Sequence, residues 1–132
     1  MIDHENEVFT RVKNAIIAKY PAANIVSVYV NAPAVFPHIS IVETDNYDVK
    51  TTIDNPFPKF SASTFKIDIY SNQKDTAKLV CKDIANIADD AFHSMNFFKQ
   101  SLVPMQNLND ATLYRMTGVY TVLSDKNNFY QK

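Results

Sequence analysis

Glycine and cysteine are almost missing from this sequence, and each shortage excludes a class of site. Gly118 is the only glycine among 132 residues, where average usage gives roughly nine. Tight turns must therefore use Asn and Asp, and a glycine-rich loop that holds a phosphate group is excluded. Cys81 is the only cysteine, which excludes a disulfide framework and any metal site with several thiolate ligands.

The charge balance and the hydropathy pattern exclude further classes. Thirteen Lys and Arg residues face fourteen Asp and Glu residues, for a net charge of −1, so no strongly cationic surface is available for non-specific binding to nucleic acid or to a membrane. No apolar run approaches the ~20 residues that cross a bilayer, and the polar, acidic N-terminus does not resemble a signal peptide. We therefore expect a soluble protein of a reducing cytoplasm.

The length suits a single domain, residues 1–132, and the order of the predicted elements is that of an α+β fold. Helices are predicted over 3–20 and 73–95. Strands are predicted over 25–30, 38–43, 60–71, 97–105 and 113–123, with the first two paired as a hairpin. We expect a mostly antiparallel sheet of about four to five strands with two helices packed on one face, in the order α-β-β-β-α-β-β. A long exposed loop over 44–59 and a polar tail over 124–132 complete the domain, and an edge strand is free to pair with another copy of the chain.

Local signals predict where the helices begin and how the last strand is shaped. Asp3 is the expected N-cap of the first helix, and Ser71 or Asn72 that of the second, with Asp75 completing a capping box. The second helix has one apolar stripe that should lie on the sheet: Ala77, Val80, Cys81, Ile84, Ala88, Ala91 and Met95. Gly118, inside the last strand, predicts a bulge or the close approach of another backbone.

No group of residues has the spacing of a catalytic or metal site. His4, Glu5 and Glu7, together with His93, are the best metal-ligand candidates, but their spacing matches no reliable pattern and a solvated helix start is the simpler interpretation. Cys81 lies on the apolar stripe, which favours a core residue over a nucleophile. We therefore predict no catalytic residue, no cofactor and no bound metal.

Three further groups of charged residues have simple structural interpretations. Asp89 and Asp90 are predicted to be a solvated helix face, with an acidic contact as the alternative. Asp68 and Asp83 form no obvious acid/base pair. Lys74, Lys78 and Lys82 form a row on one helix face, which is weak evidence for DNA contact beside a net charge of −1.

The loop and the tail are the strongest candidates for partner contacts. Phe57 lies between two prolines, which lower the entropic cost of presenting an aromatic side chain. The predicted interface residues are Tyr47, Asn55, Pro56, Phe57, Pro58, Phe129 and Tyr130. The alternative, that Phe57 and Phe60 pack back onto the core, stays open.

Several short motifs follow one another in the C-terminal half. They are the strand Phe65-Lys66-Ile67-Asp68-Ile69-Tyr70 entering a long helix, then Met95-Asn96-Phe97-Phe98, Pro104, the run Leu108-Asn109-Asp110-Ala111-Thr112-Leu113-Tyr114-Arg115, and Val119-Tyr120. This arrangement resembles the tail terminator, or tail completion, proteins of long-tailed bacteriophages, also called minor capsid or head-tail joining proteins. The chain differs from many members at Asn96, where they carry glycine, and at Val119, where they carry a basic residue.

The resemblance implies a structural virion protein and not an enzyme. Such proteins form a homo-oligomeric ring, a hexamer in this family, at the head-proximal end of the tail. The ring would cap the tail tube, end tube polymerisation and dock the tail to the head connector, with the tail-tube protein and the head-connector protein as partners. DNA would pass through the lumen without sequence-specific binding, no membrane would be involved, and assembly would take place in the host cytoplasm. The residues alone leave open a second class, a small monomeric α+β module that binds a protein or a ligand.

Overall fold

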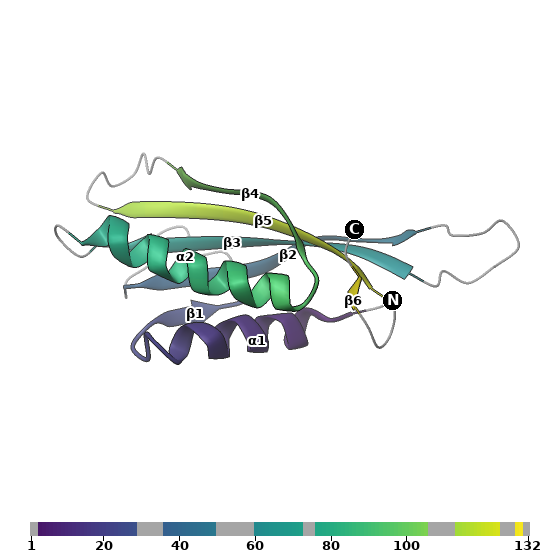
Figure 1. Ribbon diagram of the computed structural model, residues 1–132, viewed down its shortest axis with the longest axis horizontal. Coiled ribbons are helices and arrows are strands. Elements are labelled where there is room, and N and C mark those ends of the chain that lie inside the picture. The colour runs from purple at the N-terminus through teal and green to yellow at the C-terminus, as the bar shows by residue number, and fades with distance from the viewer. Residues whose placement is uncertain are drawn as a thin grey trace, which may run out of the picture.

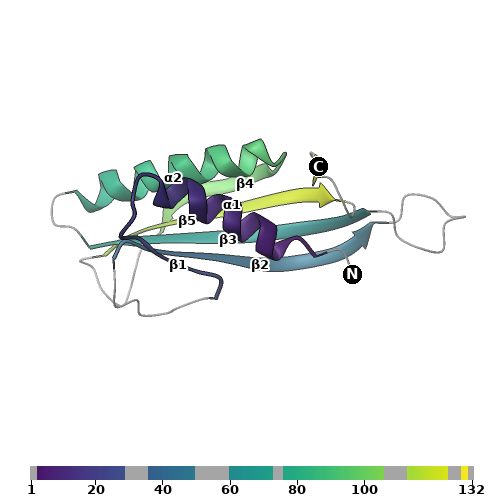
Figure 2. The same ribbon diagram turned by 90° about the horizontal axis from the view of Figure 1, so that it is seen from below.

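The computed structural model describes residues 3–28, 36–49, 60–72, 76–105, 113–124 and 129–130, without the side chains at 48, 49, 60 and 130. Two helices cover one face of a sheet, as Figure 1 and Figure 2 show. The elements are α1 (Glu5–Ile17), β1 (Asn24–Val26), β2 (His38–Val49), β3 (Phe60–Ser71), α2 (Ala77–Ser94), β4 (Phe98–Met105), β5 (Tyr114–Ser124) and β6 (Phe129–Tyr130). The α+β class and the predicted order of helices and strands are confirmed, with β6 as an additional short strand.

The sheet has the strand order β1-β2-β3-β5-β4, and β6 pairs with β5. All pairs are antiparallel except β1 with β2, which run parallel from Asn24 opposite His38 to Val26 opposite Ser40. The predicted hairpin of the first two strands is therefore wrong. Short β-branched runs predict strands, but they carry no signal for the direction in which two strands pair.

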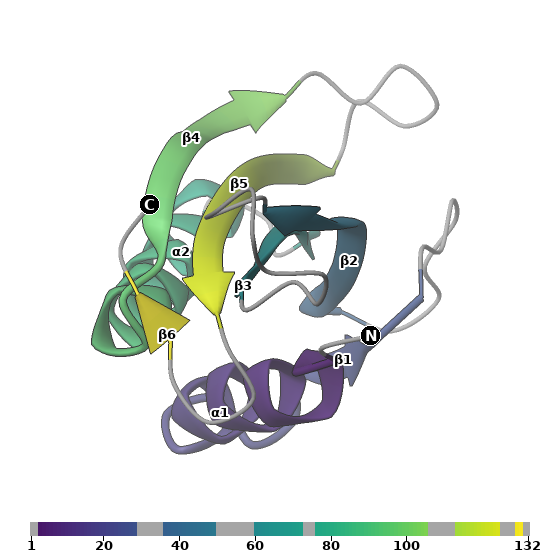
Figure 3. The same ribbon diagram turned by 90° about the vertical axis from the view of Figure 1, so that its right-hand side faces the viewer.

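Alternation along the strands separates the core from the opposite face. Apolar side chains of the sheet, including Ile39, Ile41, Phe65, Ile67, Ile69 and Tyr120, are almost fully buried together with those of the helices, including Val8, Val12, Ile16, Ile84 and Phe92. Viewed along the strands in Figure 3, α1 and α2 lie on the same side of the sheet. Burial of these side chains from water holds the two layers together.

β2 is much longer than the sequence predicts. It passes Glu43 and continues to Val49, paired with β3 from Asp45 opposite Thr64 onwards, after a bulge between Glu43 and Asp45. The loop predicted over 44–59 is thus wrong for 44–49, and 50–59 lie outside the described residues. Asp and Asn have a low propensity for strands, but the backbone pairing of β2 with β3 outweighs that local preference. We call residues 44–49 and 60–64 the arm.

The tail prediction is also wrong in part. Ser124 is the last residue of β5, and the polar tail contains β6, where Phe129 pairs with Ser124 and Tyr130 with Leu123. Two backbone pairings therefore join residues 129 and 130 to β5.

The helix starts differ from the predicted caps. His4 is the N-cap of α1 without a side-chain hydrogen bond, and Asp3 instead accepts a hydrogen bond from the Glu5 N–H at 3.0 Å. Thr76 is the N-cap of α2, so neither Ser71 nor Asn72 caps it. The apolar stripe of α2 is confirmed, because its members are buried or partly buried against the sheet.

Gly118 has regular strand pairing, opposite Ile67 on β3 and Leu102 on β4. The predicted bulge is absent at this position; the irregularity between β4 and β5 lies between Lys99 and Ser101. Neighbouring side chains, and not a backbone, approach Gly118. A Cβ atom there would lie 3.0 Å from both Ile67 Cγ2 and Leu102 Cδ1.

Candidate functional site

The predicted interface residues that the structure describes lie at one end of the sheet. Tyr47, on the arm, is opposite Ala62 on β3, which is opposite Leu123 on β5, which is opposite Tyr130 on β6. Tyr47 is 46% exposed. Asn55, Pro56, Phe57 and Pro58 lie outside the described residues. The start of α1 lies at the same end of the sheet: the ring centroid of His4 is 4.6 Å from that of Phe129.

Phe129 packs against other side chains of the same chain. It is partly buried on the core, and its ring lies 5.9 Å from that of Phe97. The Asn96 side chain donates a hydrogen bond to the Phe129 carbonyl at 2.9 Å. Asn96 has a φ of 67°, which Asn tolerates better than most residues. These contacts hold β6 against the turn between α2 and β4, and a contact of Phe129 with a partner stays a prediction.

The face of the sheet opposite the helices carries exposed apolar side chains on β2 and β4, whereas its central residues Ala62, Thr117 and Thr121 are buried. By strand register, Tyr47, Phe98, Val103 and Met105 all point to this side, and each is 45–48% exposed. We call this side of the described sheet the helix-free face. Its other members include Val42, Ala62, Thr64, Lys66, Thr117, Val119, Thr121 and Leu123. Three of the four exposed residues follow one another along β4, and exposed apolar side chains that lie together mark contact sites.

A buried polar network occupies one end of the helix-free face. Oδ1 of Asp68 accepts hydrogen bonds from Arg115 Nη2 at 2.8 Å, Arg115 Nε at 3.2 Å and Thr117 Oγ1 at 2.7 Å. The Arg115 guanidinium also lies over the Tyr70 ring, 5.3 Å from its centroid. Because Asp68 is 2% exposed, the network neutralises a buried charge.

His38 lies beside this network and is 1% exposed. Its Nδ1 is 3.0 Å from Asn24 Nδ2, and its ring is 6.1 Å from that of Tyr70. Burial lowers the pKa of His38, which favours the neutral imidazole. The contact with Asn24 joins β1 to β2 by side chains as well as by backbone.

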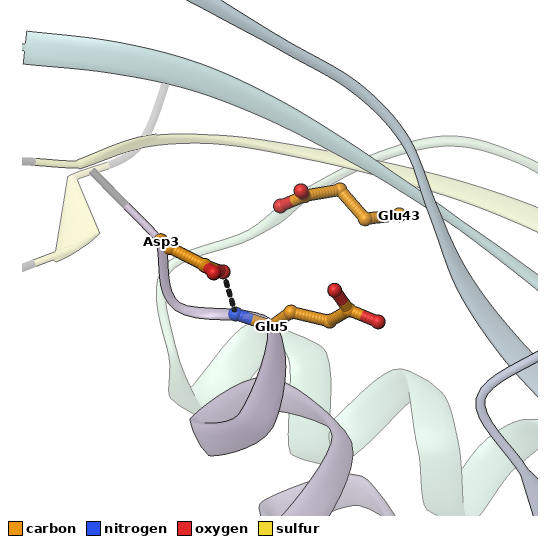
Figure 4. A group of neighbouring side chains, drawn as sticks. All are labelled: Asp3, Glu5 and Glu43. Atoms are coloured by element: carbon orange, nitrogen blue, oxygen red, sulfur yellow. Dashed lines mark hydrogen bonds between the residues drawn. The ribbon is translucent and has the colours of Figure 1, made fainter. Parts of the chain in front are cut away.

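Three carboxylates meet where α1 begins beside β2. Oxygen atoms of Asp3, Glu5 and Glu43 lie within 4.8 Å of one another (Figure 4). Burial, followed by repulsion from Asp3 and Glu5, raises the pKa of Glu43. Oxygen donors of this kind suit hard cations such as Ca²⁺, but Asp3 is exposed and Glu5 only partly buried. Of the four candidate ligands His4, Glu5, Glu7 and His93, His4 lies 3.4 Å from Glu7 at the start of α1, whereas His93 lies 3.2 Å from Asp89 on α2.

The remaining titratable candidates have structural partners. The Tyr120 hydroxyl donates to Asp89 Oδ1 at 2.6 Å, and Asp89 is only 18% exposed, so its assignment to a solvated face is wrong. Asp83 accepts from the Tyr20 hydroxyl at 2.5 Å and contacts Lys19 Nζ at 2.7 Å. This hydrogen bond raises the pKa of Tyr20 to about 12. It joins the end of α1 to α2.

Cys81 is fully buried among core side chains, as its place on the stripe predicts. Burial raises the pKa of its thiol to about 12, which makes the thiolate rare. Lys78 and Lys82 are exposed on α2, and Lys74 lies outside the described residues. Within the part of the chain that the structure describes, no helix is long and apolar enough to span a membrane.

Comparison with known proteins does not extend these observations. No protein-family model matches the chain, and no curated protein matches it significantly.

Proposed function

We propose that this chain is a structural virion protein that forms a ring on the head-proximal end of a phage tail, ends polymerisation of the tail tube and docks the tail to the head connector. The observation that carries the proposal is the helix-free face, where Tyr47, Phe98, Val103 and Met105 expose apolar surface. A protein that works by contact needs such a surface, and a net charge of −1 suits a ring through which DNA passes without adhering.

The arm is the part that supports a role in assembly. It carries Tyr47 at the sheet end where β6 and the start of α1 also lie. The 50–58 segment connects its two strands and contains Pro56, Phe57 and Pro58. We propose that this segment and Tyr47 contact the neighbouring subunit in the ring.

The test is a variant without residues 50–58. Lys59 alone would then connect Val49 to Phe60, so their pairing is lost, but the rest of the pairing of β3 with β2 and β5 is unchanged, and we expect a nearly unchanged circular dichroism spectrum and only a small fall in the unfolding midpoint. We expect it to lose ring formation on purified tail tubes of the phage that encodes the chain, measured by electron microscopy of tube ends and by tube length during polymerisation.

The matched control replaces 50–58 by nine Gly and Ser residues, which keeps the length and removes the aromatic and proline side chains. This variant should fail like the deletion if those side chains make the contact. Normal capping by both variants would disprove the role of the segment. Failure of the wild-type chain to cap tubes or end their growth would disprove the proposed function itself.

A further inference from the structure

We propose that neighbouring copies of this chain join edge to edge, with β4 of one copy beside residues 41–45 of β2 of the next, so that their sheets are continuous. This contact rests on the proposed function and specifies the two surfaces through which subunits of the ring join. A strand that is added to the edge of a sheet forms hydrogen bonds along its backbone. Because the two surfaces differ, the contact is head-to-tail, the kind that closes into a ring.

Both edges of the sheet leave room for a further strand. β4 is the last strand in the order β1-β2-β3-β5-β4, and six of its eight residues are exposed. At the opposite edge, β1 covers β2 only from His38 to Ser40. From Ile41 to Asp45, no second strand among the described residues lies beside β2 on that side. Figure 2 shows β4 under α2 at one side of the sheet and β2 at the other.

The directions of the strands suit this arrangement. β2 is antiparallel to β3, β3 to β5 and β5 to β4, so β2 and β4 run in opposite directions. A neighbour that is turned about an axis along the strands keeps its strand directions and keeps its helices on the same side of the sheet. Its β2 is therefore antiparallel to the β4 that it meets, which is the commoner way for two strands to pair.

Glu43 and Lys99 lie at the two ends of one row of cross-strand partners. Glu43 is opposite Phe65, Phe65 is opposite Tyr120, and Tyr120 is opposite Lys99. Both edges are irregular at this level, because the register shifts directly after Glu43 on β2 and directly after Lys99 on β4. A neighbour that continues the sheet row for row therefore places these two opposite charges side by side.

The β2 edge carries negative charge that the described part of the chain leaves without an ion pair. Carboxylate oxygens of Asp3 and Glu5, at the start of α1, lie within 4.8 Å of one another and of Glu43. None of the three forms a salt bridge with another described residue. Cations of a neighbouring copy would relieve the repulsion among them.

The flank of α2 above β4 supplies such cations. Asp89 lies 3.6 Å from Lys99 Nζ, so this flank of the helix faces β4. Lys82 and Lys78 precede Asp89 by seven and eleven residues, which are close to two and three turns. Both lysines are exposed on that flank. The edge formed by β4 and α2 therefore complements the edge formed by β2 and α1.

Pro104 limits where the added strand pairs, because it has no N–H to donate. We expect pairing from Phe98 to Val103, a stretch similar in length to residues 41–45 of β2. Prolines and bulges at an edge also disfavour pairing with unrelated strands. The two edges therefore select each other by matching irregularities and charge.

The first test is cysteine cross-linking with a short bis-maleimide, on the full chain at high concentration and on capped tail tubes. Thr44→Cys and Gln100→Cys place exposed thiols next to the Glu43–Lys99 row on opposite edges. A mixture of the two variants should give a product of twice 15.0 kDa. Each variant alone is the control and should stay uncoupled, since Cys81 is 0% exposed.

The outcomes separate the edge contact from the proposed function. Coupling of either variant with itself would overturn the head-to-tail contact. A chain that caps tubes while the mixture stays uncoupled in both settings would overturn the edge contact and leave the proposed function standing. Coupling of the mixture by a chain that neither caps tubes nor ends their growth would support the edge contact and disprove the proposed function.

The second test reverses charges at the edges. Lys99→Glu should lower the yield of the cross-link about tenfold, and adding Glu43→Lys should restore it. Because Lys99 also contacts Asp89, Lys82→Glu is a second variant that should lower the yield. Lys66→Glu makes the same charge change in the middle of the sheet and should leave the yield unchanged. Circular dichroism verifies folding, and a yield that neither edge variant lowers would overturn the proposal.

Discussion

At the scale of single residues, the choice of glycine at position 118 is set by the space between its neighbouring side chains and not by its backbone conformation. It lies in regular strand pairing between Ile67 and Leu102, and a Cβ atom would also lie 3.1 Å from Tyr120 Cε2. The Tyr120 ring cannot move aside easily, because it stacks on Phe92 at 4.2 Å and its hydroxyl is held by Asp89. The single glycine of the chain thus makes room for side chains of both adjacent strands.

Gly118→Ala is therefore expected to destabilise the fold by about 1–3 kcal/mol, the usual cost of overpacking. In an unstrained strand the same change would stabilise, since alanine loses less entropy on folding. Urea unfolding measures the difference. In a Leu102→Ala background the cost should be smaller, because one of the two closest atoms is gone. A Gly118→Ala variant as stable as the wild type would show that Ile67 and Leu102 adjust freely.

At the scale of elements, the start of α1 is held against β2 at an electrostatic cost. Asp3 and Glu5 lie where negative charge favours a helix start, but both face Glu43 on β2 (Figure 4). The raised pKa of Glu43 means that the folded state binds a proton there more readily than the unfolded state does. The ionised side chain therefore reduces stability at neutral pH, and the loss is relieved as pH falls through the raised pKa.

Glu43→Gln should increase the free energy of unfolding at pH 7 by about 0.5–1 kcal/mol, a small value because partial exposure screens the repulsion. The advantage should shrink toward pH 4, where the wild-type carboxyl takes up its proton. Urea unfolding at several pH values measures both effects. Glu7→Gln is the control, because Glu7 pairs with Arg11 at 3.1 Å and its loss should bring no gain. A Glu43→Gln variant less stable than the wild type at pH 7 would contradict this account.

At the scale of the whole molecule, one continuous core joins α1, α2 and the sheet, and Cys81 lies inside it. Its Sγ is 3.4 Å from the Tyr114 carbonyl oxygen of β5, and its exposure is 0%. Reagents reach such a thiol only when the layers separate. Cys81 is thus a natural probe of opening of the domain.

A thiol reagent at pH 8 should modify Cys81 in the folded protein at least about 100-fold more slowly than in urea, since both access and thiolate formation are suppressed. Leu79→Cys adds a thiol at a 68% exposed position of the same helix and should give one fast and one slow reaction. Absorbance of the released chromophore follows both. Rapid modification of the folded wild-type chain would mean that α2 separates from the sheet far more easily than its packing indicates.

The sequence by itself determined the elements whose signals are local. The spacing of Val8, Val12 and Ile16 along α1, the stripe of α2 and the alternation in β3 specify which side of each element is buried. These periodicities depend only on the geometry of one helix or strand, so no distant residue is needed to interpret them.

Only the tertiary structure decided how those elements meet. The parallel pairing of β1, the continuation of β2 to Val49 and the docking of Phe129 on the core each depend on residues far away in the chain. So do the contact of Asp68 with Arg115 and that of Asp89 with Tyr120. Local propensity predicted a loop, a polar tail and a solvated face at several of these places. Long-range hydrogen bonds and burial contribute more free energy there than the local preference, and no short window of sequence contains both partners.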